Sequence, residues 1–366
     1  MNNYSITVMK FKGTLVMCLL LFMIYTFDIN EFHYVHYLCL VLISVMTFTK
    51  LELKSEITYV NALLVIILTS FLRVNQWTIL MAKDLGLMLV GILPFLCNAN
   101  FKFNISIFNK FLWILFVIAA GSRLFSLNFS INAFLSSNTG IELGSFAYTF
   151  AFLAVYWVGK SSRNVYLNIL FSVIAGKRIV TLSILVCVLI AFFCKGKETK
   201  YVNKYIKIGL FALVVVYIVL SYMFAYGLFD SFILSTFDRS ANQLTMGRQR
   251  LFLATFSHIS IPEFWGIGAG NSIDIIHAAT NDMRMHNDFL KIYAENGLFV
   301  FIAFFYVLFR KLRYSQLPYI TTMFALFMTT NTMIYAIEIF LFGLFFNADK
   351  YFYYRNSKKT VPLVST

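Results

Sequence analysis

Charged residues are scarce in this chain, and their scarcity decides its class. Of the 366 residues only 13% are charged, whereas 60% are hydrophobic, 18% are aromatic and the mean hydropathy is +0.77. Water-soluble domains carry about 25% charged residues, because their surface has to be solvated. This composition excludes an ordinary soluble domain, a disordered chain and a coiled coil. It predicts one integral membrane domain over residues 1–366.

Negative charge is the scarcer sign, with 16 Asp and Glu against 30 Lys and Arg and a net charge of +14. Lys and Arg collect in the cytoplasmic loops of membrane proteins, so this excess indicates orientation rather than nucleic-acid binding. With the N-terminus inside, the cation-rich connections at 195–207 and 310–313 both fall on the cytoplasmic side. We therefore predict that both termini are cytoplasmic and that the number of spans is even.

Twelve apolar runs are candidates for membrane-spanning helices, which need about 20 apolar residues each. They lie near residues 13–28, 34–49, 57–72, 79–97, 111–127, 142–159, 164–176, 179–194, 208–226, 289–309, 317–332 and 333–348. Barrel strands would alternate apolar and polar residues, and these runs do not. We predict an all-α, polytopic membrane protein of about 12 transmembrane helices. Two pairs of runs are short, so ten spans with a re-entrant hairpin also fit.

One long polar segment, residues 227–287, interrupts the apolar runs on the predicted outward side. A loop of this length in a protein with short connections is usually functional. It contains four arginines, which are disfavoured on this side of a membrane: Arg239, Arg248, Arg250 and Arg284. Because arginine binds phosphate through paired hydrogen bonds, these residues are candidate anion ligands. Contact with lipid headgroups or with the loop surface is the alternative.

Motifs for metals, nucleotides and covalent catalysis are missing. The sequence has no HExxH, CxxC, GxSxG or GxxxxGK[ST], and its five cysteines all lie in apolar runs. His258, His277 and His286 do not share a metal-ligand spacing. The glycine-rich stretch at 266–270 (GIGAG) lacks the context of a dinucleotide site and predicts a turn, or a close backbone approach to a ligand. We therefore predict no metal and no cofactor.

The stretch 286–297 (HNDFLKIYAENG) carries helix signals at both ends. Asn287 is predicted to cap the start of a helix, and Asn296 with Gly297 to kink or end it. His286 then stands at the outer end of a membrane helix, where it can accept a proton or contact phosphate. A capping or interfacial histidine is the alternative.

Ionisable residues inside the apolar runs form a second group of candidates. Asp288, Lys291 and Glu295 are spaced i, i+3 and i+7, which places them on one polar stripe. The others are Lys83, Asp84, Arg123, Glu142 and Glu338. A charge in the membrane costs about 2.5–3.5 kcal/mol, so each of these is either a site residue or part of a structural pair.

The order and spacing of these motifs over about residues 165–313 resemble the O-antigen polymerases of the Wzy type, which share a superfamily with the O-antigen ligases. The matching features are GKR at 176–178, GRQR at 247–250, WGIGAGN at 265–271 and HNDFLKIYAENG at 286–297. The ligase branch has two glycines spaced by two residues after its histidine. Here Val300 stands where the second glycine would follow Gly297, and Lys177 stands where a small hydroxyl residue is expected. Both differences favour a polymerase.

The resemblance implies a GT-C-like glycosyltransferase of lipopolysaccharide biosynthesis. Such an enzyme transfers a growing glycan from undecaprenyl pyrophosphate onto the next undecaprenyl-pyrophosphate-linked repeat unit at the periplasmic face. Membrane lipid and a chain-length regulator protein are the further partners implied. Carried over by position, Arg178 and Arg248 would bind the pyrophosphate and His286 would be the base. The substrate-binding residues implied are Lys177, Arg239, Arg250, Arg284, Asn287 and Glu295.

Two alternatives remain open. An O-antigen ligase, or another exopolysaccharide polymerase, would use the same chemistry with a different acceptor. A flippase or transporter of lipid-linked oligosaccharides would place its charges near mid-membrane and keep its loops short, which the arginine-rich outer segment disfavours.

Overall fold

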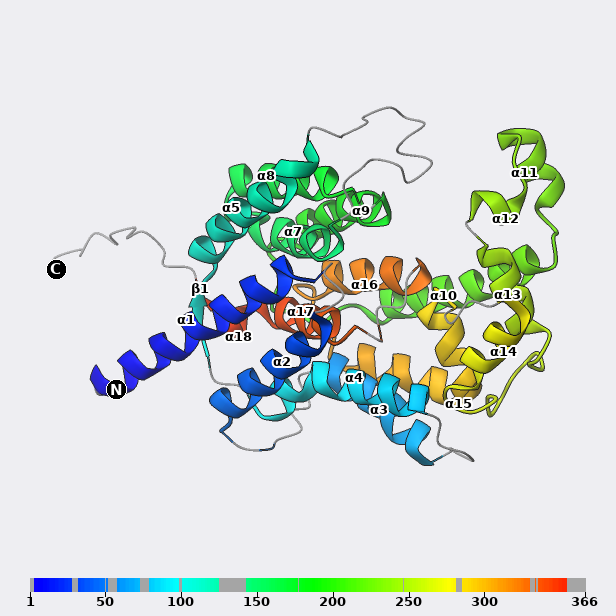
Figure 1. Cartoon of the computed structure of the whole chain (residues 1–366), viewed down its shortest axis with the longest axis horizontal. Helices are drawn as coiled ribbons and strands as arrows, with labels where there is room; N and C mark the ends of the chain where they lie inside the picture. Colours follow the sequence, from blue (N-terminus) through cyan, green and yellow to red (C-terminus); the bar gives the residue numbers. More distant parts are fainter. Residues whose placement is uncertain are drawn as a thin grey trace.

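The protein is all-α apart from one short pair of strands within the residues that the structure, a computed structural model, describes (Figure 1). Those residues are 3–27, 32–49, 51, 58–72, 79–98, 101–124, 143–176, 178–245, 247–280, 285–329, 333 and 335–353. The predicted all-α class is confirmed. The two strands, β1 (Phe103–Asn104) and β2 (Phe352–Tyr353), pair in parallel and join the middle of the chain to its C-terminal part.

Each apolar run predicted to be a span coincides with a helix. These helices are α1 (Asn3–Tyr25), α2 (His33–Thr47), α3 (Thr58–Leu72), α4 (Ile79–Leu96), α5 (Ile105–Leu124), α7 (Gly144–Trp157), α8 (Ser162–Ile174), α9 (Arg178–Cys194), α10 (Lys204–Ala225), α15 (Asp288–Arg310), α16 (Leu317–Thr329) and α17 (Ala336–Phe346). The short helix α18 (Ala348–Tyr351) follows α17.

The long polar segment is folded rather than an irregular loop. It contains α11 (Asp230–Phe237), α12 (Ala241–Leu244), α13 (Arg248–Phe256) and α14 (Asn271–Thr280). Ser240 starts α12 with a reciprocal capping box to Gln243, which satisfies two backbone donors at the helix start. In Figure 1 these four helices lie together at one end of the molecule, with α13 against the end of α10.

The core lies around α7 and α17, which are buried along their whole lengths. Helix α17 packs against α4 and α2, α7 packs against α8 and α9, and α15 packs against α3. Helix α10 is different, because only Val214, Ser221 and Ala225 of its 22 residues are buried. Many of its other apolar side chains, such as Leu213, Val216 and Val219, are exposed, and an exposed apolar surface of this kind is typical of contact with a membrane or another protein.

Two of the described helices, α10 and α15, are long and apolar enough to cross a membrane. Shorter apolar helices of 10–17 residues include α3 and α16. Length and composition alone are weak evidence for a span. The most apolar 18-residue window is 17% buried in α10 and 61% buried in α15, so the two helices have different surroundings. The predicted 10–12 spans stay a prediction.

Helices α4 and α17 approach closely at a glycine, and this contact is testable. A Cβ on Gly91 would lie 2.8 Å from the carbonyl oxygen of Ala336 and 2.9 Å from Cβ of Ile339, whereas a Cβ on Gly86 of the same helix would meet nothing within 4 Å. We expect Gly91→Ala to lower the free energy of unfolding by about 1–3 kcal/mol, because the helices must separate. Thermal unfolding in detergent should show no loss for Gly86→Ala. Equal melting temperatures for the two variants would contradict this packing.

Candidate functional site

The N-terminal end of α15 carries the cap that the sequence predicts. Asn287 has an extended backbone, and its Oδ1 accepts a hydrogen bond from the backbone N–H of Leu290 at 3.0 Å. Asn287 is therefore the N-cap, and this prediction is confirmed. The preceding residue, His286, has φ 54°, in the left-handed region that turns the chain into the cap. His286 is partly buried and lies directly outside the helix.

Tyr217 of α10 connects this cap to a neighbouring helix and lies near Arg248. Its hydroxyl accepts a hydrogen bond from Nδ2 of Asn287 at 3.2 Å and donates one to the carbonyl oxygen of Met328 at 2.5 Å. The positive charge of Arg248, the first residue of α13, acts on the same hydroxyl. The predicted site residue Asn287, next to His286, therefore binds Tyr217 directly, and Arg248 acts on the same hydroxyl through its charge.

Helix α13 is held against the outer end of α10 by one glutamine and two aromatic contacts. Nε2 of Gln249 donates to the carbonyl oxygen of Phe224 at 3.1 Å and to Oδ1 of Asp230 at 2.7 Å. The rings of Tyr222 and Phe256 lie 5.3 Å apart, edge to face, and a second aromatic pair joins the same two helices. These contacts set the position of Arg248 relative to α10.

Helix α15 is interrupted at Gly297, where φ 80° and ψ 174° leave the helical region. Such a break leaves backbone carbonyls without their helical donors. The carbonyls of Ala294 and Glu295 instead accept hydrogen bonds from the backbone N–H groups of Ile267 and Gly268, at 2.9 and 3.0 Å. The kink predicted at this point of the sequence is confirmed.

The segment 263–268 also binds the other side of the break. The N–H of Leu298 donates to the carbonyl oxygen of Glu263 at 2.7 Å. Gly266 and Gly297 face each other so closely that a Cβ on either would lie 2.6 Å from the backbone nitrogen of the other. The close backbone approach in the GIGAG stretch is therefore made to α15 of the same chain.

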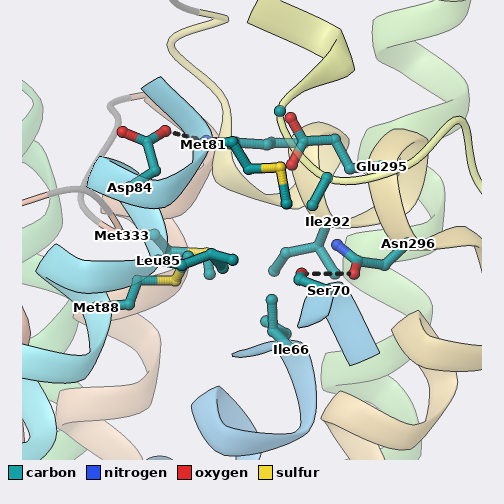
Figure 2. A pocket seen from close by; sticks show the side chains of 13 residues that line it. Ile66, Ser70, Met81, Asp84, Leu85, Met88, Ile292, Glu295, Asn296 and Met333 are labelled. Carbon is teal, nitrogen blue, oxygen red and sulfur yellow. Dashed lines mark hydrogen bonds and ion pairs between the residues drawn. The ribbon is translucent and has the colours of Figure 1, made fainter. Parts of the chain in front are cut away.

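The polar stripe of α15 binds other elements of the fold (Figure 2). Nζ of Lys291 lies 2.8 Å from Oδ2 of Asp84 in α4, and their side chains are only 13% and 14% exposed. The hydroxyl of Ser272 in α14 donates to the carboxylate of Glu295. These pairs border a cavity of about 20 Å³ whose other walls are mainly apolar, enough space for about one water molecule.

Two further polar contacts extend this network. The backbone N–H of Met333 donates to Oδ2 of Asp288 at 3.0 Å, and the hydroxyl of Ser70 in α3 donates to Oδ1 of Asn296 at 3.2 Å. When charged side chains are buried, contacts with a partner of opposite charge or with hydrogen-bonding groups offset the cost of removing them from water. The stripe predicted from the spacing is therefore present, and its residues join α15 to α3, α4, α14 and the chain before α17.

No protein-family model matches this chain, and no curated protein matches its sequence.

The structure also describes the predicted substrate-binding residues Arg239, Arg250 and Glu295. Arg239, between α11 and α12, is exposed, and so is Arg250 on α13. Glu295 is buried eight residues beyond Asn287, about 12 Å along the helix at a rise of about 1.5 Å per residue. The contacts that the structure gives Glu295 are to Ser272 and the backbone of Gly270.

The structure describes three of the predicted site residues only in part or not at all. Arg178 is the first residue of α9, but its side chain lies outside what the structure describes. Lys177 and Arg284 lie outside the described residues altogether. In the part of the chain that is described, no three His, Cys, Asp or Glu side chains are grouped so that they could hold a metal ion.

Sequence reasoning missed Tyr217, which joins the site together. It lies within the apolar run 214–220 (VVVYIVL), where a tyrosine is easily taken for a packing residue. Its hydroxyl was the available signal, since a buried tyrosine hydroxyl normally needs a hydrogen-bond partner. Which partner it finds depends on α15 and α16, which are distant in sequence.

The glycine contact at the break in α15 gives a second prediction. Gly297→Ala should cost about 3 kcal/mol or more, because the change combines a backbone conformation open only to glycine with a clash against the segment 263–268. Gly247→Ala is the matched control, since Gly247 also has positive φ but a Cβ there meets nothing within 4 Å. It should cost only about 1–2 kcal/mol. Thermal unfolding of the two purified variants tests the difference, and equal losses would mean that the close contact does not form.

Proposed function

We propose that this chain is a membrane-embedded O-antigen repeat-unit polymerase. It would transfer a growing glycan from undecaprenyl pyrophosphate onto the sugar of the next undecaprenyl-pyrophosphate-linked repeat unit. The observation that carries the proposal is the hydrogen bond from Asn287, the residue after His286, to the hydroxyl of Tyr217, on which the charge of Arg248 also acts. Arg248 starts α13, which packs on α10, and His286 directly precedes α15. A lipid-linked diphosphate would present its headgroup at this end of the two long apolar helices.

The arrangement in the membrane is part of the proposal. The apolar helices would form a bundle of 10–12 spans in the bacterial inner membrane, with both termini in the cytoplasm and the segment 227–287 at the periplasmic face. The outward-facing apolar surface of α10 supports a lipid environment. The cations that follow α9 and α15 support a cytoplasmic position for those helix ends.

The chemistry needs charge stabilisation and one proton acceptor. The oxygen of the acceptor hydroxyl attacks the anomeric carbon, a carbon–oxygen bond forms, and the bond from that carbon to the diphosphate oxygen breaks. The electron pair leaves with undecaprenyl pyrophosphate, whose negative charge Arg248 would stabilise. His286 would take the hydroxyl proton, since a histidine with a near-neutral pKa can accept a proton at physiological pH.

A lipopolysaccharide gel separates this function from the alternatives. Cells lacking the gene should retain core with a single repeat unit, and a plasmid copy of the wild type should restore the ladder of longer chains. Bare core with polymer left on the carrier lipid would instead indicate a ligase. Bare core without outward-facing repeat units would indicate a flippase, and an unchanged ladder would reject all three functions.

Arg248→Ala should slow polymerisation by about tenfold to a hundredfold, because a hydrogen bond to a charged group contributes about 1.5–3 kcal/mol. Arg248→Lys should fall in between, since lysine keeps the charge but not the paired geometry. Arg163→Ala removes an exposed arginine of α8 and should leave the ladder unchanged. Ladder length on the gel and the rate with purified lipid-linked repeat units provide the measurements. A full-length ladder from Arg248→Ala would reject the role of this residue.

Tyr217→Phe should lower kcat with little change in KM, because it removes the hydroxyl that orients Asn287 while keeping the ring. Leaving the Asn287 amide without its partner costs about 1–3 kcal/mol, so the rate should fall by about fivefold or more. Tyr222→Phe on the same helix is the control, since the ring contact of Tyr222 with Phe256 is retained. The rate with purified substrate and the melting temperature should be measured together. A rate equal to that of the wild type would mean that Tyr217 does not position the site.

A further inference from the structure

A second and larger cavity lies at the other end of α10 and α15 from the candidate site. Its volume is about 280 Å³, against about 20 Å³ for the cavity beside Lys291. The lining includes residues 314 and 315, just after α15, residue 194 at the end of α9, and residues 195 and 198 between α9 and α10. Backbone hydrogen bonds from Tyr314 to Lys200 and from Ser315 to Glu198 hold these two connections together.

The floor of this cavity is apolar and buried. It is formed by Val155 of α7, Pro318 of α16, and Phe345 and Phe346 of α17. A small hydrophilic ligand would leave this floor in contact with water, at a cost of about 25 cal/mol for each Å² of apolar surface. The floor therefore favours a ligand with an apolar part.

The mouth of the cavity is cationic. Lys160 and Lys195 line it and are exposed, and Nζ of Lys160 is held over the ring of Tyr156, 3.6 Å from its centroid. Glu198 lies between these charges. A hydrogen bond from the backbone N–H of Gly196, at 2.9 Å, lowers the pKa of the Glu198 carboxyl, and the charges of Lys160 and Lys195 lower it further. A Cβ on Gly159, the residue before Lys160, would lie 3.8 Å from Nζ of Lys195, so both lysines reach the same part of the mouth.

The surface next to the mouth is apolar as well. Phe192 and Phe193, which directly precede Cys194 and Lys195, are 53% and 80% exposed. A molecule with an acyl chain can therefore reach the cavity along α9 without passing through water. Tyrosines at the mouth fit the same position, because they are enriched where the membrane meets water.

We propose that this cavity binds one anionic phospholipid of the inner leaflet, with its phosphate at Lys160 and Lys195 and the start of an acyl chain against Phe345 and Phe346. Basic pockets between membrane helices on the cytoplasmic side suit anionic headgroups, whose leaflet is negatively charged. The bound lipid contacts α7, α9, α16 and α17 and so joins helices that surround the core. This inference rests on the proposed orientation of the protein in the membrane, with this cavity on the cytoplasmic side. It does not depend on the proposed glycosyl transfer.

Native mass spectrometry of the full chain in detergent tests the proposal, with dioleoylphosphatidylglycerol as the probe. We expect one tightly bound lipid and weaker binding of dioleoylphosphatidylcholine. The double variant Lys160→Gln/Lys195→Gln should bind phosphatidylglycerol with an affinity at least about tenfold lower than that of the wild type. Each lysine near an anionic lipid contributes about 1 kcal/mol. The control Lys200→Gln/Lys204→Gln removes the same charge from exposed positions at the same end, and its affinity should change by less than about twofold.

A second variant, at a lining residue of α9, keeps the test decisive if the lysine variant does not fold. Ala191→Trp fills the cavity and keeps both lysines, so it should also lose the bound lipid. Phosphatidylglycerol should raise the melting temperature of the wild type but not that of Ala191→Trp. Equal binding of phosphatidylcholine, equal losses in the two lysine variants, or lipid retained by Ala191→Trp would each overturn the proposal. Displacement of the lipid by glycerol phosphate would also overturn it, because the ligand would then be a soluble anion.

Discussion

The break in α15 at Gly297 is the constraint on which the end of the protein that carries α11 to α14 depends. A helix interrupted inside a bundle leaves backbone N–H and carbonyl groups that cannot remain unbound in an apolar interior. The segment 263–268 supplies their partners from both sides, and it can do so only because Gly266 and Gly297 have no side chains where they meet. The outer segment and the bundle are therefore joined through the backbone rather than through surface side chains.

This join determines where the polar stripe of α15 lies. The half of the helix before the break is held by Asp84 of α4, Ser272 of α14 and Ser70 of α3. With that half of the helix fixed, its first turn brings Asn287 to Tyr217 and leaves His286 just outside the helix. The packing of α13 on α10 then places Arg248 where its charge acts on the hydroxyl of Tyr217. The site is thus a consequence of the same hydrogen bonds that close the break.

Cations occupy both ends of the bundle, in different surroundings. At one end Arg248 starts α13, which packs on α10, and there we propose a reacting diphosphate. At the other end Lys160 and Lys195 line the larger cavity, and there we propose the headgroup of a lipid that stays in place. The physical principle is common to both, since a cation near the membrane surface attracts phosphate, and the surrounding side chains decide whether the ligand reacts or is retained.

Local patterns in the sequence determined the helical class, the position of each long helix, the Asn287 cap and the kink at Gly297. These features depend on hydropathy over a few turns and on the conformational preferences of single residues. Only the tertiary structure decided that α13 packs on α10 and α14 on α15, that the GIGAG stretch fills the break in α15, and that Tyr217 binds Asn287. Each of these contacts pairs residues that are tens of positions apart, and a hydrogen-bond partner at that separation is set by how the helices pack, which no local pattern encodes.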